Sequence, residues 1–257
     1  MLEAWKTRGI PRFLQLDNDA VFCGGYKAKR VLGGFVRLCL FVGVELIFIP
    51  FKEPQHNYQV EQLNGLWGGR AFWLRHHFRS FHNVRYWAPK FSKWYMHDYT
   101  PPILEGHTPI RQQRIEHRPH LTNQMQQLIP DTLPITAGRI HKWPASGRKW
   151  PFEGPSRGHA GPFIRRVQPE SGPAPQTGRE ASRGHGSIRI LNEVWSVNKR
   201  LADHYVWATI TTHSRSLDIW YRRSLSTPWR LVKHVYYDLG ESVHHHIHPF
   251  AKLHTMY

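Results

Sequence analysis

The chain has 257 residues and carries 35 Lys and Arg against 18 Asp and Glu, which gives a net charge of +17 at pH 7. Such an excess of positive charge favours a polyanionic partner, namely DNA, RNA or an anionic membrane surface. The longest apolar stretch, residues 44–51, is far shorter than the roughly 20 residues of a spanning helix, so no membrane insertion is expected. The chain starts without the apolar region of a signal peptide, and its 2 cysteines lack a CxxC spacing, which predicts a cytoplasmic protein with reduced thiols.

The first quarter of the chain predicts alternating strands and helices. Residues 13–16 form a short apolar run that predicts a buried strand, and residues 17–26 contain the Asp, Asn and Gly typical of a loop. From 26 to 42 apolar residues recur at helical spacing, and residues 44–50 predict a second strand that ends at a proline. A helix is expected over 58–66. The order strand, helix, strand indicates an α/β fold with a parallel sheet.

The amino-acid composition of the rest of the chain changes twice. Residues 71–99 are unusually aromatic, and core packing is favoured for these rings over base stacking. Residues 111–138 predict a linker. Beyond them, β-branched and aromatic residues alternate with polar ones in five short segments, which predict a small barrel or sandwich. Residues 142–162 and 168–186 are rich in Pro, Gly and Ser and are expected to be disordered insertions. The five predicted strands are 163–167, 187–192, 205–213, 216–222 and 230–237.

Two carboxylates are candidates for sharing a divalent cation. Asp17 ends the first predicted strand, and Glu61 follows 44 positions later near the start of a predicted helix. Mg²⁺ prefers such hard oxygen ligands, and two ions can stabilise the attacking and leaving oxygens of a phosphodiester. Asn64 shares the helix face of Glu61 and could contact the same phosphate region. The alternatives are a turn-capping role for Asp17 and a competing ligand in Glu53, while Asp19 is interpreted as a turn residue.

The basic residues of the tail are candidates for contacts with phosphates. Residues 139–189 hold 10 Lys and Arg against 3 Glu, and a solvated charged surface is the alternative interpretation. The histidines of residues 244–248 lack a second ligand pair, so they are interpreted as structural, and nothing in the sequence indicates zinc. The candidate nucleic-acid-binding residues, besides Asn64, are Arg139, Lys142, Arg148, Lys149, Arg165, Arg166 and Arg189.

Three segments carry a resemblance to a known family. The segments "LQLDNDAVF", "GVELIFIPFKEPQHNYQVEQLNGLW" and "LEGHTP" together resemble the second half of the catalytic core of DDE integrases and transposases, which have an RNase H-like fold. The resemblance implies that Asp17 and Glu61 are catalytic and bind Mg²⁺ or Mn²⁺, and that DNA is the partner in metal-dependent strand transfer. It implies a partial integrase core over 1–110, a linker over 111–138 and a basic SH3-like barrel over 139–257. It also allows a homo-oligomer and, in a bacterium, a location at the nucleoid.

The chain departs from the family pattern at three points. Asp19 replaces a small residue, the spacing from Asp17 to Glu61 is longer than in retroviral members, and the 16 residues before Asp17 contain no Asp that could be the first catalytic carboxylate. We therefore expect the chain to be the C-terminal portion of a longer enzyme and to be inactive by itself. The alternatives are a nucleic-acid-binding module without catalysis and a decayed transposase fragment.

Overall fold

The structure is a computed structural model whose described residues form two compact units. Met1–His56 and Pro119–Tyr257 make the first unit, and Asn57–Arg118 make the second. This division groups the chain differently from the predicted domains, because strands of the predicted tail pair with strands of the predicted core. The described residues are 1–19, 22, 30–49, 58–69, 78–112, 118–142, 165–166, 186–191, 193–201, 204–224 and 226–251.

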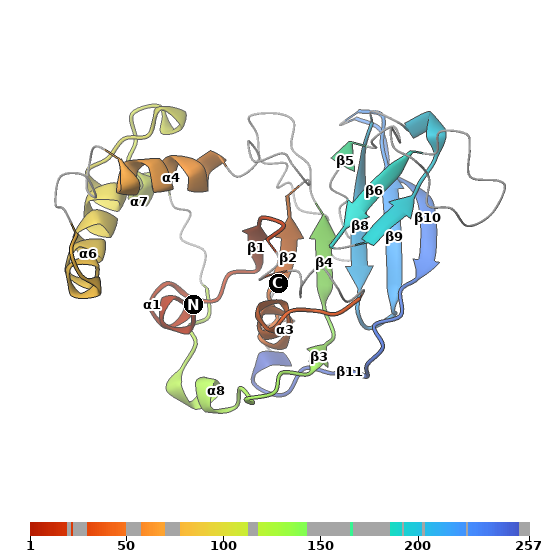
Figure 1. The fold of residues 1–257 in the computed structure, drawn as a ribbon, viewed down its shortest axis with the longest axis horizontal. Helices are drawn as coiled ribbons and strands as arrows, with labels where there is room; N and C mark the ends of the chain where they lie inside the picture. Colours follow the sequence, from red (N-terminus) through yellow and green to blue (C-terminus); the bar gives the residue numbers. More distant parts are fainter. Residues whose placement is uncertain are drawn as a thin grey trace. The chain divides into compact units, whose positions relative to one another are not determined.

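The first unit is built on a mixed sheet with the strand order β1–β2–β4–β8–β9–β10 (Figure 1). β1 and β4 both run parallel to β2, whereas β8 runs antiparallel to β4 and is followed by an antiparallel meander. The short strand β5 pairs with β8. The bounds are β1 Phe13–Leu16, β2 Glu45–Phe48, β4 Arg139–Lys142, β5 Arg165–Arg166, β8 Tyr205–Thr211, β9 Ser216–Tyr221 and β10 Arg230–Tyr236.

Smaller elements surround this sheet. β3 (Ile135–Thr136) pairs parallel with β11 (Val243–His244), and β6 (Ser187–Ile190) pairs antiparallel with β7 (Glu193–Ser196). The segment Pro119–Leu121 lies against the first helix, since Ile10 N donates to Pro119 O at 2.8 Å and Leu121 N donates to Trp5 O at 3.2 Å. The helices of this unit with described bounds are α1 Leu2–Arg8, α3 Gly34–Phe41, α8 Asn123–Gln127 and the 3₁₀ turn η3 Lys199–Leu201.

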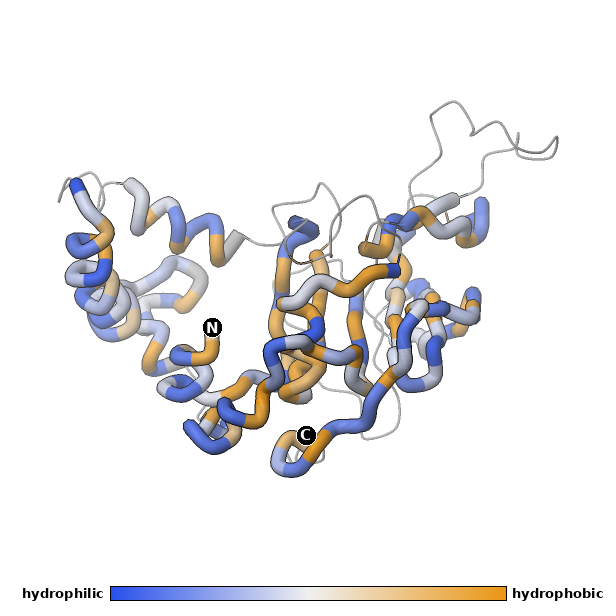
Figure 2. Tube along the Cα trace, turned by 60° about the horizontal axis from the view of Figure 1, so that its bottom comes forward, coloured by the Kyte–Doolittle hydropathy of each residue, from blue (hydrophilic) through white to orange (hydrophobic). Residues whose placement is uncertain are grey.

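The main core lies on one face of the sheet. Side chains alternate between the two faces of a strand, so one row of cross-strand partners shares a face. The row Leu46, Ile140, Ile210 and Leu217 crosses from β2 to β9, and all four are at most 2% exposed. Val36 and Leu40 of α3 belong to the same cluster. Figure 2 shows hydrophobic residues concentrated along these strands. Burial of this apolar row is the main force that holds β4 between β2 and β8.

The second unit is helical and aromatic. Phe91 of α6 is 8% exposed, and its ring lies 5.0 Å from Trp67 between centroids, while Trp67 stacks on Phe78 at 5.4 Å. These rings fit the predicted packing role of the aromatic segment. Phe81 and Tyr86 differ, because 69% and 56% of their surfaces are exposed. The elements with described bounds are α4 Tyr58–Gly68, α6 Phe81–His97, η2 Pro102–Leu104 and α7 Pro109–Gln112.

The α/β class predicted from the sequence is confirmed, and the predicted barrel differs from what is observed. The strands expected over 205–213, 216–222 and 230–237 are β8, β9 and β10, but within the described residues they extend an open sheet. The unpredicted strand β4 causes this difference, because it links β8 to β2. Of the predicted disordered insertions, 143–162 and 168–185 lie outside the described residues.

No helix in the described part of the chain combines the length and the hydropathy that crossing a membrane requires.

Candidate functional site

Asp17 stands at the carboxyl end of two parallel strands. β1 ends at Leu16, whose backbone oxygen accepts a hydrogen bond from Ile49 N at 2.9 Å, just beyond the end of β2. In open α/β sheets, ligands bind at the carboxyl ends of the strands, where loops carry polar side chains past the sheet edge. Asp17 is exposed at this position. The sequence therefore places a solvent-accessible carboxylate where α/β folds build their sites.

Neighbouring polar groups fix the turn that follows Asp17. Asn18 Nδ2 donates to Ile49 O at 2.7 Å, so the loop after β1 is tied to the end of β2. Asp19 N donates to Asp17 Oδ1 at 3.3 Å, and Phe22 N donates to Asp19 O at 3.1 Å. A carboxylate that accepts from the amide two residues later is typical of an Asx turn. Asp19 thus lies in a turn, in agreement with its interpretation from the sequence, and Asp17 itself helps to form that turn.

Glu61 and Asn64 lie on α4 in the second unit. Both side chains are exposed, and Glu61 belongs to the first turn of the helix. A carboxylate in the first turn also stabilises a helix by interacting with its dipole, which gives Glu61 a structural role of its own. Asp17 belongs to the first unit and Glu61 to the second. Their predicted convergence on one cation stays a prediction, and Glu53, the competing ligand, lies outside the described residues.

The ligand chemistry at these positions suits a hard cation. Mg²⁺ is commonly bound through one or two carboxylates, while water and phosphate oxygens complete its octahedron. Asp17 is exposed and places a carboxylate next to the backbone of a fixed turn. The described residues contain no group of three or more His, Cys, Asp or Glu side chains positioned to hold a metal ion. Among the described residues, Asp17 therefore fits as a single carboxylate ligand.

A polar network lies within the sheet, on the face opposite the main core. Glu45, the first residue of β2, is only 6% exposed. Its Oε1 accepts from Arg139 Nη2 at 2.8 Å, and its Oε2 lies 2.8 Å from His141 Nε2. The other ring nitrogen, His141 Nδ1, lies 3.1 Å from Thr209 Oγ1, which also accepts from Trp207 Nε1. The network links β2, β4 and β8.

The charge balance of this network favours an ionised Glu45. Burial by itself raises the pKa of a carboxyl group, because the charged form loses its hydration. Here the hydrogen bond and charge of His141, together with those of Arg139, outweigh burial and lower the pKa of Glu45 to about 2. A one-residue slip of β4 would leave this carboxylate buried without its partners, which is costly. The network therefore helps to fix the register between β2 and β4.

Thr209, His141 and Glu45 contact one another in series. Their side chains are of the types that serve elsewhere as a nucleophile, a base and an orienting carboxylate. The three side chains are 2%, 3% and 6–7% exposed, respectively. A substrate cannot reach a hydroxyl that is buried to this degree. The network is therefore structural. The same row of cross-strand partners continues from Thr209 to Asp218 and His234, a second polar pair in which Oδ1 and Nδ1 lie 2.6 Å apart.

The predicted phosphate-binding residues of the tail divide into four groups. Arg139 is two-thirds buried and ion-paired with Glu45, so its guanidinium already has a structural partner. Arg189 is half-buried on β6, opposite Val194 of β7. Lys142 ends β4, and Arg165 and Arg166 form β5, so all three are placed by backbone pairing. Arg148 and Lys149 lie outside the described residues.

The sequence interpretation missed Glu45, His141 and Thr209. One signal was present, because "VELIFIP" places a single carboxylate inside an apolar run. Buried charges are normally paired, so a Glu in such a strand predicts a cationic partner elsewhere in the chain. The sequence did not indicate which of the 35 Lys and Arg residues or 19 His residues it would be.

Family models, curated proteins and solved structures were each compared with the chain, and none of the three comparisons gives a match.

Proposed function

We propose that the chain is a component of a DDE-type integrase or transposase that acts on DNA through metal-dependent phosphodiester strand transfer. In this proposal β1, α3 and β2 correspond to part of an RNase H-like core. Asp17 and Glu61 are the catalytic residues that hold Mg²⁺ or Mn²⁺, and Asn64 contacts the DNA phosphates near Glu61.

One observation carries the proposal. Asp17 follows β1 at the carboxyl end of a parallel pair, and Asn18 anchors the next residue to Ile49 O at 2.7 Å. This arrangement gives an exposed carboxylate with a fixed backbone, as a metal-dependent nuclease or transferase requires. The "DND" segment that forms it is also part of the resemblance to the family.

The residues have distinct tasks in the proposed chemistry. When bound, the metal ions stabilise the charge that develops on the attacking and leaving oxygens of the phosphodiester. Asp17 holds a cation beside the sheet edge, and its Oδ1 keeps the turn closed through Asp19 N. Glu61 contributes the second carboxylate from the first turn of α4. Two carboxylates bind a pair of ions weakly, so the chain by itself is expected to be inactive in strand transfer.

Metal binding tests the role of Asp17. We expect the water-proton relaxation of Mn²⁺ solutions to show weak binding by the chain, reduced several-fold in Asp17→Asn. The matched control is Asp19→Asn, which changes a neighbouring exposed carboxylate of the same turn and is expected to bind as the wild type does. Equal losses in both variants would mean that the turn attracts cations only through its general charge, and the proposed ligand role would be wrong.

Strand transfer tests the expected inactivity. A 3′-end joining assay with Mg²⁺ or Mn²⁺ is expected to show no product for the chain alone. Product formation that Glu61→Gln abolishes would contradict the expected inactivity, although it would support the proposed catalytic role of Glu61.

A second candidate is a nucleic-acid-binding module without catalysis. It is favoured by the +17 charge and by α6, a helix with exposed aromatic and basic residues and no acidic residue. Deleting 139–257 is an unsuitable test, because the deletion removes β4, β8, β9 and β10 from the sheet. Salt-dependent DNA titrations of full-length charge variants avoid this problem. DNA binding that persists unchanged in Asp17→Asn, Glu61→Gln and the metal-free protein would favour this candidate.

The remaining alternative is a decayed fragment that does not fold stably. Circular dichroism with a thermal melt separates it from the other two. A cooperative transition, as expected for the buried core described above, would exclude it.

A further inference from the structure

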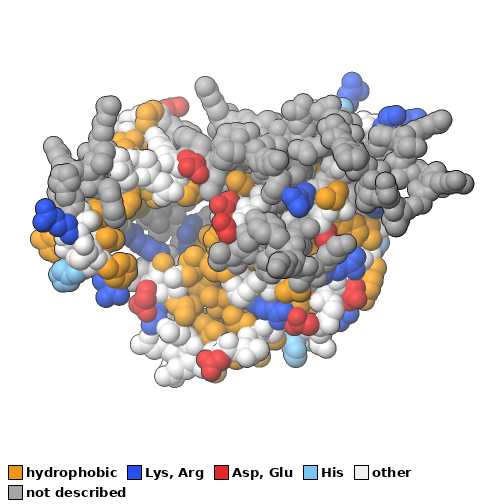
Figure 3. Space-filling view, in the orientation of Figure 1, with side chains coloured by type: hydrophobic (Ala, Val, Ile, Leu, Met, Phe, Trp, Pro, Cys, Tyr) orange, Lys and Arg blue, Asp and Glu red, His pale blue; other side chains and the backbone are white. Residues whose placement is uncertain are grey.

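The surface of α6 combines exposed aromatic rings with positive charge. The helix has 17 residues and holds Arg85, Lys90 and Lys93 but no Asp or Glu. Phe81 and Tyr86 are 69% and 56% exposed, although large aromatic side chains are normally buried. Figure 3 shows Lys and Arg beside hydrophobic and histidine side chains over this helix.

Each exposed ring has its own cation. The Arg85 guanidinium carbon lies 4.8 Å from the centroid of the Phe81 ring, and Lys90 Nζ lies 3.9 Å from the centroid of Tyr86. Lys90 Nζ also donates to Tyr86 Oη at 2.6 Å. Both pairs have the spacing i, i+4, which places ring and cation next to each other on a helix surface. The helix therefore carries two pairs, each made of one flat ring and one positive charge.

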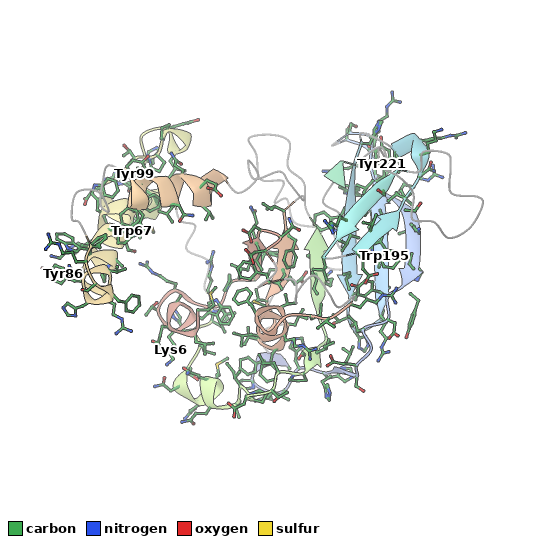
Figure 4. The ribbon with its side chains drawn as sticks, in the orientation of Figure 1. Lys6, Trp67, Tyr86, Tyr99, Trp195 and Tyr221 are labelled. Atoms are coloured by element: carbon green, nitrogen blue, oxygen red, sulfur yellow. The ribbon has the colours of Figure 1, made fainter. Side chains whose placement is uncertain are left out.

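Both ring–cation pairs lie on the exposed half of α6. Phe81 and Tyr86 are five residues apart, which corresponds to about 7.5 Å along the helix axis and to about 140° around it, so the two rings point in different directions. Lys93 is also exposed on this half, whereas Phe91 faces inward. In Figure 4, Tyr86 lies on the outer side of α6, away from Trp67 and Tyr99 of the packed aromatic cluster.

We propose that this exposed half of α6, which carries Phe81, Arg85, Tyr86, Lys90 and Lys93, binds unpaired DNA strands. Bases stack on the rings of Phe81 and Tyr86, and the phosphates between them lie next to the cations. The assignment rests on the proposed function in taking DNA as the polyanion, and it adds a surface in the second unit that is separate from the carboxylates.

The chemistry of the surface favours unpaired strands over duplex DNA. In a duplex the faces of the bases are already stacked, so exposed aromatic rings gain little from contact with it. Proteins that bind single strands combine aromatic stacking platforms with a positive groove or surface, and both components are present on α6. An apolar protein partner is disfavoured, because burying three basic side chains among the rings would cost their hydration.

The experiment is a fluorescence anisotropy titration of the full chain with labelled oligo(dT) and with a hairpin duplex of the same length. The double variant Phe81→Leu/Tyr86→Leu keeps the apolar character and removes the flat rings. We expect it to lower the affinity for oligo(dT) by about 30-fold, from a minimum of about fivefold for each stacked ring, and to change duplex affinity by less than about twofold. Tyr86→Phe keeps a ring and should bind oligo(dT) as the wild type does.

Two further variants sharpen the result. Tyr236 of β10 is 62% exposed in the first unit, so Tyr236→Leu is a matched control that should leave oligo(dT) binding unchanged. Arg85→Gln/Lys90→Gln should reduce the slope of log affinity against log salt by about 1.4, as expected for two lost phosphate contacts to a single strand. Unchanged thermal melts would show that each variant folds.

The outcomes separate this inference from the proposed function. Oligo(dT) affinity of Phe81→Leu/Tyr86→Leu within about twofold of the wild type would overturn the inference, while duplex binding and metal dependence would still support the proposed function. Tighter binding of the wild type to anionic vesicles than to oligo(dT), lost in the double variant, would make this exposed half of α6 a lipid-binding surface instead. Absence of binding to either DNA would contradict both proposals.

Discussion

Replacing Glu45 by Gln tests whether the polar network inside the sheet stabilises the fold. The side chain is almost completely buried and accepts hydrogen bonds from two partners at 2.8 Å. Gln has the same shape but no charge, so the cationic Arg139 would lose its counterion, and one acceptor oxygen would become an NH₂ group. Breaking a buried, hydrogen-bonded ion pair typically costs about 3–5 kcal/mol.

The pKa of Glu45 gives a second value for the contribution of this carboxylate to the free energy of unfolding. A shift from 4.5 in the unfolded chain to about 2 in the folded protein corresponds to about 3 kcal/mol at neutral pH. Because the folded pKa is the lower one, this stabilisation is fully present above pH 4.5 and is lost as the pH falls toward about 2. The free energies from the ion pair and from the pKa shift agree, so Glu45→Gln is expected to lower the free energy of unfolding at pH 7 by about 3 kcal/mol.

Urea unfolding followed by circular dichroism, from pH 7 down to about pH 2, measures the effect. The difference between wild type and Glu45→Gln should be largest at neutral pH and should shrink through the window from 4.5 to about 2. Glu3→Gln, which changes an exposed carboxylate paired with Lys6, is the control and should track the wild type. A difference that stays constant with pH would refute the assignment of the stabilisation to the ionised Glu45.

Two further predictions concern buried groups of the first unit. Tyr237 is fully buried, and its hydroxyl has no hydrogen-bond partner in the described structure. In urea unfolding, Tyr237→Phe should therefore be neutral or stabilise the fold by up to about 1 kcal/mol. A clear loss of stability would show that the hydroxyl has a hydrogen-bond partner. Burial raises the pKa of the Cys39 thiol to about 12, so in a Cys23→Ser background a disulfide reagent should modify Cys39 only under unfolding conditions. Rapid modification of the native protein would show that α3 opens locally.

The local elements were largely predictable because they depend on neighbouring residues. Apolar runs and period-two alternation located β1, β2 and the strands β8, β9 and β10 within a few residues of their observed bounds. α3 is shorter than its predicted range, since it begins at Gly34 directly after the N-cap Gly33. Glycine disfavours the helix interior but is accepted at its first positions, which explains the later start.

The strand β4 was not predictable by the same means. Its sequence, Arg139–Lys142, alternates charged or polar residues with a single isoleucine and has no second apolar side chain. It is a strand because Ile140 joins the buried row of Leu46 and Ile210, and because Arg139 and His141 reach Glu45, 94 and 96 positions away in the sequence. No local pattern contains such a pairing, so the tail was assigned to a separate barrel.

The candidate site was predictable only in part for a related reason. The segment "DND" after an apolar run predicted a carboxylate at a strand end, and Asp17 directly follows β1. The polar partners of Arg139 were not anticipated, so a residue predicted to contact phosphate has a structural counterion instead. Whether Asp17 and Glu61 meet depends on how two separate units are arranged, which strand and helix patterns do not encode.

The central position of β4 has a consequence for the order of folding. β1 and β2 come from the first 48 residues, but β2 gains its second neighbour only when residues 139–142 are available, and that strand pairs in turn with β8 at 205–211. Contacts of such long sequence separation form late and slow folding, because the loops must close before the pairing is gained. During synthesis on the ribosome, β2 would therefore stay without its β4 neighbour until most of the chain has been made. We expect slow refolding and early binding of chaperones to the exposed strand.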